Sequence, residues 1–87
     1  MKVIEIIVDA GAVQSVVTSA SERGAEDHWL GPISADGRQA VRLLVRAERL
    51  QDVLDGFQGL LSEDDGSVRI LVYPLEVSLP RPTEEND

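Results

Sequence analysis

The sequence contains no cysteine, one histidine, three aromatic side chains and only eight basic residues among its 87 positions. Without cysteine the chain forms no disulfide, no thiolate metal site and no cysteine nucleophile. The eight Lys and Arg residues stand against 16 Asp and Glu residues, which makes the formal net charge −8. Because affinity for phosphate groups comes from basic side chains that displace counterions, this balance argues against a nucleic-acid partner.

Long hydrophobic runs are also missing. Glu5 and Asp9 interrupt the apolar N-terminal stretch, which excludes a standard secretory signal. No stretch approaches the roughly 18 apolar residues that span a bilayer. We therefore expect the chain as given to be soluble and to lie on the cytoplasmic side. At 87 residues it has room for one domain, whose core must consist of Val, Leu, Ile and Ala, and a small aliphatic core gains stability from self-association.

Patterns that would carry catalysis or metal binding are incomplete. His28 lies beside Glu26 and Asp27, but no second histidine completes a transition-metal set, and the alternative is a surface histidine on a strand. The acidic run 63–66 lacks the ligand spacing of a calcium loop and favours a solvated turn. Neither Gly-x-Ser-x-Gly nor a glycine-rich phosphate motif occurs. We predict that the chain is not an enzyme and has no cofactor and no metal site.

The hydrophobic periodicity predicts six elements. Residues 2–8 and 69–73 are β-branched strands, and residues 39–47 form a third strand that follows an Asp-Gly turn at 34–37. Residues 25–33 form an edge strand, because Gly31 and Pro32 weaken it. A helix follows the N-cap Asp9 and ends at Gly24, and a second helix spans residues 48–61.

The resulting order β-α-β-β-α-β predicts an α+β fold. We expect a ferredoxin-like sandwich over residues 1–79, with a four-stranded antiparallel sheet and two helices on one face. Residues 80–87 are expected to form a proline-rich acidic tail. The predicted buried side chains are Val16, Val17, Leu43, Leu54, Phe57 and Val72.

Strand alternation predicts that the opposite face of the sheet is too apolar for free exposure. We expect a homo-oligomer interface there, formed by Val3, Ile7, Arg42, Leu44, Arg46, Leu71 and Tyr73, with Glu5 opposite Arg42, Arg46 and Arg69. The alternative is that a membrane-proximal segment covers this face. Arg38, Arg42 and Arg46 share it, either to bind a small anion or to cover apolar surface and pair with acids.

The C-terminal stretch VRILVYPLEVSLPRP (68–82) resembles the end of the soluble N-terminal domain in the domain of unknown function 389 (DUF389) family of bacterial and archaeal membrane proteins. The matching residues are Pro74, Leu75, Glu76, Leu79, Pro80, Arg81 and Pro82. KVIEIIV, DGRQAVRLLV and AERLQDVLDGFQGLL match more loosely.

The resemblance implies a non-enzymatic regulatory or assembly domain. Its partner would be a downstream transmembrane region, and the full-length protein would lie in the cell membrane. It transfers no catalytic or binding residue to this chain. The alternative is a free-standing small-molecule sensor that resembles amino-acid-binding regulatory domains, which use the same order of elements and bind ligands at subunit interfaces.

Overall fold

The computed structural model describes residues 1–63 and 68–76. Its strands are β1 (Lys2–Asp9), β2 (Asp27–Ile33), β3 (Arg38–Val45) and β4 (Arg69–Pro74). Its α-helices are α1 (Val13–Glu22), α2 (Leu50–Asp55) and α3 (Gln58–Glu63), and two short 3₁₀ helices are η1 (Ala10–Ala12) and η2 (Ala47–Arg49).

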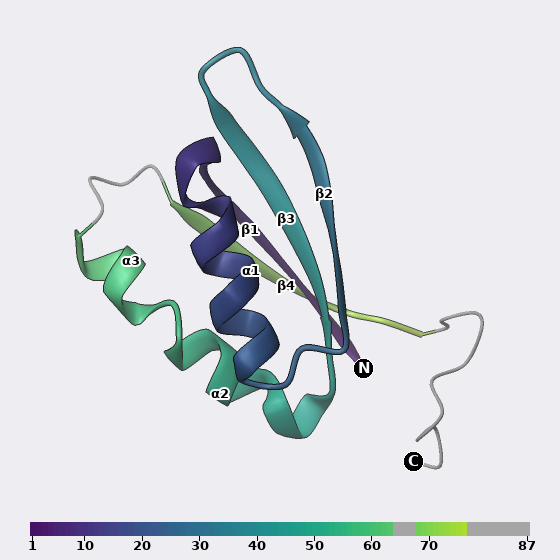
Figure 1. Ribbon diagram of the computed structural model, residues 1–87. Helices are drawn as coiled ribbons and strands as arrows, with labels where there is room; N and C mark the ends of the chain where they lie inside the picture. Colours follow the sequence, from purple (N-terminus) through teal and green to yellow (C-terminus); the bar gives the residue numbers. More distant parts are fainter. Residues whose placement is uncertain (64–67, 77–87) are drawn as a thin grey trace.

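The four strands form one antiparallel sheet in the order β2-β3-β1-β4, so β2 and β4 are its two edges. The helices lie together on one face of this sheet (Figure 1). This arrangement confirms the predicted α+β, ferredoxin-like fold. It also confirms that the strand containing Gly31 and Pro32 is an edge strand, and the pairing of β2 with β3 is irregular between Leu30 and Ile33, where these two residues lie.

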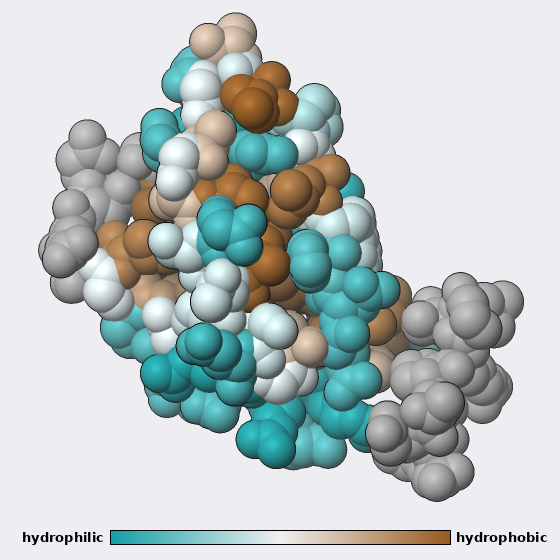
Figure 2. All heavy atoms as spheres, in the orientation of Figure 1, coloured by the Kyte–Doolittle hydropathy of each residue, from teal (hydrophilic) through white to brown (hydrophobic). Residues whose placement is uncertain are grey.

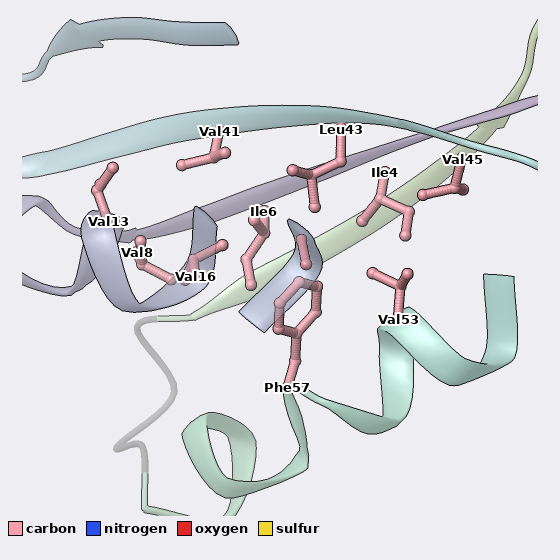
Figure 3. Close-up of a cluster of buried hydrophobic side chains, with 11 residues drawn as sticks. Ile4, Ile6, Val8, Val13, Val16, Val41, Leu43, Val45, Val53 and Phe57 are labelled. Atoms are coloured by element: carbon pink, nitrogen blue, oxygen red, sulfur yellow. The ribbon is translucent and has the colours of Figure 1, made fainter. Parts of the chain in front are cut away.

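The core lies between the sheet and the helices. It contains Ile4, Ile6, Val8, Val13, Val16, Ala20, Val41, Leu43, Val45, Val53 and Phe57. Figure 3 shows the Phe57 ring pointing from the end of α2 toward Ile6 on the sheet. Alternate residues of β1 and β3 supply the sheet side, because successive side chains of a strand point to opposite faces.

Burial was predicted correctly for three of the six named side chains and only partly for two others. Val16, Leu43 and Phe57 are fully buried, whereas Val17 and Leu54 are partly buried and pack against the core. The prediction for Val72 is wrong, because its exposed fraction is 42%. Val72 does point to the helix side, opposite Ile4, but β4 is an edge strand and has a neighbouring strand on one side only.

Two glycines adopt positive φ where the sequence predicts a turn or a helix end. Gly24 has φ +104° and follows α1, as expected for a C-terminal cap. Gly37 has φ +82° in the β2–β3 turn, where its N–H donates to the Ser34 carbonyl at 2.9 Å. Asp9 does cap a helix, since its carboxylate accepts from Gly11 N–H at 2.9 Å, but the helix it caps is η1, which precedes α1.

The second predicted helix is not continuous. It divides into η2, α2 and α3, with a turn at Gly56 and Phe57 that separates the two α-helices. A β-carbon on Gly56 would lie only 2.7 Å from Cδ of Arg23, which extends from the end of α1. Arg23 also donates to the carboxylate of Asp52 at 3.0 Å. Absence of a side chain at Gly56 therefore permits the close approach of α1 and α2.

Two sequence predictions fall partly or wholly outside the described residues. The acidic run 63–66 lies there beyond its first residue, and so do the end of the predicted domain at 79 and the tail 80–87. Within residues 1–63 and 68–76, no helix has the length and apolar character needed to cross a membrane.

Candidate functional site

The face of the sheet opposite the helices, here called the open face, carries the residues predicted to form an interface. Strand pairing places Val3 of β1 beside Leu44 of β3 and Tyr73 of β4. In the next outward-facing row, Glu5 lies between Arg42 and Leu71. Because directly paired residues share one side of a sheet, these predicted residues do occupy one surface.

Exposure varies across this surface. Leu71 and Tyr73 on the edge strand β4 are exposed at 37% and 42%, whereas Val3 and Ile7 on the central strand β1 are half-buried. Leu44 was expected to be part of an exposed patch, and that expectation is wrong because only 8% of it is accessible. That this surface contacts a second copy of the chain stays a prediction.

Glu5 is the polar centre of the open face. Its side chain is only 12% exposed, and its carboxylate accepts hydrogen bonds from Arg42 at 3.3 Å and from the Tyr73 hydroxyl at 2.5 Å. The predicted pairing of Glu5 with Arg42 is therefore confirmed. The hydrogen bond to the Glu5 carboxylate raises the pKa of Tyr73 above its ordinary value, because it is made by the protonated phenol.

Arg46 does not contact Glu5, contrary to expectation. Its guanidinium lies 3.4 Å from the carboxylate of Glu26 and 4.0 Å from that of Glu48, and its side chain is 17% exposed. Sequence reasoning missed Glu26 as its partner, because the two residues lie on separate strand ends and only the folding of β2 against β3 brings them together. With Arg42 and Arg46 both paired to carboxylates, a small-anion site formed by the arginines of β3 loses support.

Two hollows adjoin Glu26 at the end of the sheet where β2 begins. The first, of about 270 Å³, lies between α1 and β2 and includes Ser21, Asp27 and His28 above an apolar floor that includes Val17 and Leu43. This is where the structure places His28. Within the described part of the chain no group of three or more His, Asp or Glu side chains could hold a metal ion.

The second hollow, of about 520 Å³, is lined by Gly24, Glu26, Arg46, Glu48 and Arg49. It contains two guanidinium groups, and Arg49 is the more accessible, with 57% of its side chain exposed. The side chain of Arg49 also passes close to Gly24, where a β-carbon would lie 3.2 Å from its Cδ. The mixed charges of this hollow suit a small polar ligand better than an apolar one.

The fold is shared with solved structures of known proteins. The nitrogen regulatory PII-like protein CPII from Thiomonas intermedia K12, bound to ADP, AMP and bicarbonate, superposes with a TM-score of 0.75 at 22% identity over 91% of each chain. A putative PII-like signaling protein from Thermus thermophilus gives 0.68 at 18% identity, over 82% of this chain and 81% of that one.

A DUF3240 family protein from Shewanella baltica OS155 gives a TM-score of 0.65 at 14% identity, over 88% of this chain and 91% of that one. No family model and no curated protein matches the sequence. These levels of identity establish a common fold and transfer no residue roles. The chain therefore has the fold of these PII-like proteins.

Proposed function

We propose that this chain is a non-enzymatic regulatory domain that senses a small molecule. The observation that carries the proposal is the match over 91% of both chains to a PII-like protein that binds ADP, AMP and bicarbonate. It favours the sensor alternative from the sequence over a domain whose only role is assembly. A regulatory domain of this kind needs a binding site and a contact through which binding is transmitted.

The hollow beside Arg46 and Arg49 is the candidate binding site. The three ligands of the similar protein are anions, and of the two hollows that adjoin Glu26 only this one includes positively charged side chains. An anion bound there would compete with Glu26 and Glu48 for Arg46. Because Glu26 N–H also donates to the Leu44 carbonyl at 2.7 Å, displacement of its side chain would be felt at the start of β2.

The proposal is tested by thermal unfolding in the presence of ADP, AMP or sodium bicarbonate, each matched for ionic strength. A ligand at 100 times its Kd stabilises the folded state by about 2.7 kcal/mol. For a domain of this size such a change raises the melting temperature by roughly 10–20 °C. At least one of the three compounds is expected to produce a rise that saturates with concentration.

Two arginine variants locate the site. Arg49→Gln removes a charge from the hollow, whereas Arg69→Gln removes an exposed charge from the start of β4. The ligand-induced rise should shrink in Arg49→Gln and persist in Arg69→Gln. If none of the compounds stabilises the parent chain, the sensor proposal is wrong for these ligands. A rise that only Arg69→Gln abolishes would move the site to the sheet.

The resemblance to the DUF389 family concerns a different point, namely whether the domain is attached to a membrane region. That attachment stays a prediction. It is checked by reading the coding sequence beyond residue 87, where a series of apolar segments would support it.

A further inference from the structure

The large hydrophobic side chains that remain exposed are concentrated on the two edge strands. Among the residues that the structure describes, six of the seven are on β2 or β4: Trp29, Leu30, Ile33, Leu71, Val72 and Tyr73. The seventh, Leu61, lies on α3. Figure 2 shows part of this distribution from the helix side, where hydrophobic surface is visible over the β2–β3 hairpin while hydrophilic side chains cover α2.

These side chains lie on both faces of the sheet. Trp29 pairs with Arg42 on the open face, whereas the next residue, Leu30, pairs with the core residue Val41 and so points to the helix side. On the other edge, Val72 also points to the helix side. A partner stacked on the open face would leave Leu30 and Val72 uncovered. A strand added at the edge would cover both faces at once.

The polarity of the strands allows one edge to pair with the other. All neighbours in the order β2-β3-β1-β4 are antiparallel, so β2 and β4 run in opposite directions. When β4 of one copy lies beside β2 of the next in the same orientation, the added pair is also antiparallel and the sheet continues without a break. This contact is heterologous, and each copy uses both of its edges.

Charge favours this pairing over pairing of like edges. The β2 edge begins with Asp27 directly after Glu26, and the β4 edge begins with the exposed Arg69. Pairing β2 with β2 would bring the acidic residues of two copies together and would leave β4 uncovered. Pairing β4 with β2 brings opposite charges together and covers both edges.

We propose that this chain assembles with further copies of itself by head-to-tail pairing of β4 with β2. Leu30 and Val72 are the residues that distinguish this contact from stacking of the open faces. The assembly does not depend on the proposed ligand, so the two proposals are tested separately.

The test uses two variants, each of which blocks one edge. Leu30→Lys places a charge on β2 and Val72→Lys places one on β4, and an inward-pointing lysine is a common means of preventing edge pairing. Both side chains are already exposed, at 49% and 42%. Leu61→Lys is the matched control, because Leu61 is also 42% exposed but lies on α3. Circular dichroism of each variant checks that it is folded.

Sedimentation at several concentrations gives the readout. The parent chain and Leu61→Lys are expected to form oligomers, whereas Leu30→Lys and Val72→Lys each sediment as the 9.5 kDa monomer. An equimolar mixture of these two variants should form a species of twice the monomer mass and nothing larger, because each contributes the one edge that the other lacks. This recovery in the mixture also shows that both variants are folded.

Other results overturn the proposal. A parent chain that stays monomeric at every concentration excludes self-assembly. Oligomers of Leu30→Lys or of Val72→Lys alone would mean that like edges or the open faces make the contact. A mixture that remains monomeric, although each variant is folded, would exclude pairing of β4 with β2.

Discussion

Phe57→Ala is the substitution for which the structure predicts the largest loss of stability. Phe57 is fully buried and is the largest of the fully buried side chains. It occupies the turn between α2 and α3, and its ring packs against the sheet side of the core (Figure 3). Truncation of a buried phenylalanine to alanine costs about 3–5 kcal/mol, because the transfer free energy is lost and a cavity remains.

This cost is large relative to the stability of the whole domain. At about 0.05–0.15 kcal/mol per residue, a chain of this length is stable by roughly 4–13 kcal/mol. With a change of 4–8 °C in melting temperature per kcal/mol, the variant should melt about 12–40 °C below the parent chain. At the upper end of this range it would be unfolded at room temperature.

Denaturant titration followed by circular dichroism measures the loss. Leu61→Ala is the control, because that side chain is 42% exposed and its truncation should cost less than about 1 kcal/mol. If Phe57→Ala costs no more than Leu61→Ala, the ring does not hold the helices to the sheet, and the assignment of the core is incorrect.

Two further predictions concern backbone strain and ionisation. Gly37→Ala should lower the free energy of unfolding by about 1–2 kcal/mol because φ is +82°, whereas Gly59→Ala should raise it by up to about 1 kcal/mol because Gly59 is helical and has open space; equal effects in denaturant titrations would contradict the assigned conformations. Tyr73, the only tyrosine, should titrate above its ordinary pKa in an ultraviolet absorbance titration, and the stability that its hydrogen bond to Glu5 contributes should be complete below about pH 10 and lost as pH rises through the raised pKa; Glu5→Gln should return the titration toward the ordinary value.

Several elements could be predicted because their signals are local. β1 and β3 alternate strictly, so Ile4, Ile6 and Leu43 were assigned to the core before the fold was known. The hairpin turn and the end of α1 followed from Gly37 and Gly24, where the chain needs positive φ. Signals of this kind depend only on neighbours in the sequence.

The candidate site was predicted less completely. Arg42 was correctly placed beside Glu5, because both positions follow from the alternation of long strands. Trp29 was not assigned to the open face, since Gly31 and Pro32 disturb the alternation of the strand that contains it. The break at Gly56 was missed as well, because the helical periodicity of residues 48–61 continues through it.

The sequence by itself determined the order of strands and helices and the side chains that β1 and β3 turn toward the core, because periods of 2 and 3.6 residues are properties of the local chain. Only the tertiary structure decided which strands are edges, and therefore why Val72 is exposed although its alternation points it toward the helices. It also decided the ion pairs and hydrogen bonds, since the Tyr73 hydroxyl meets Glu5 across 68 residues of sequence and no local pattern specifies which distant groups come into contact.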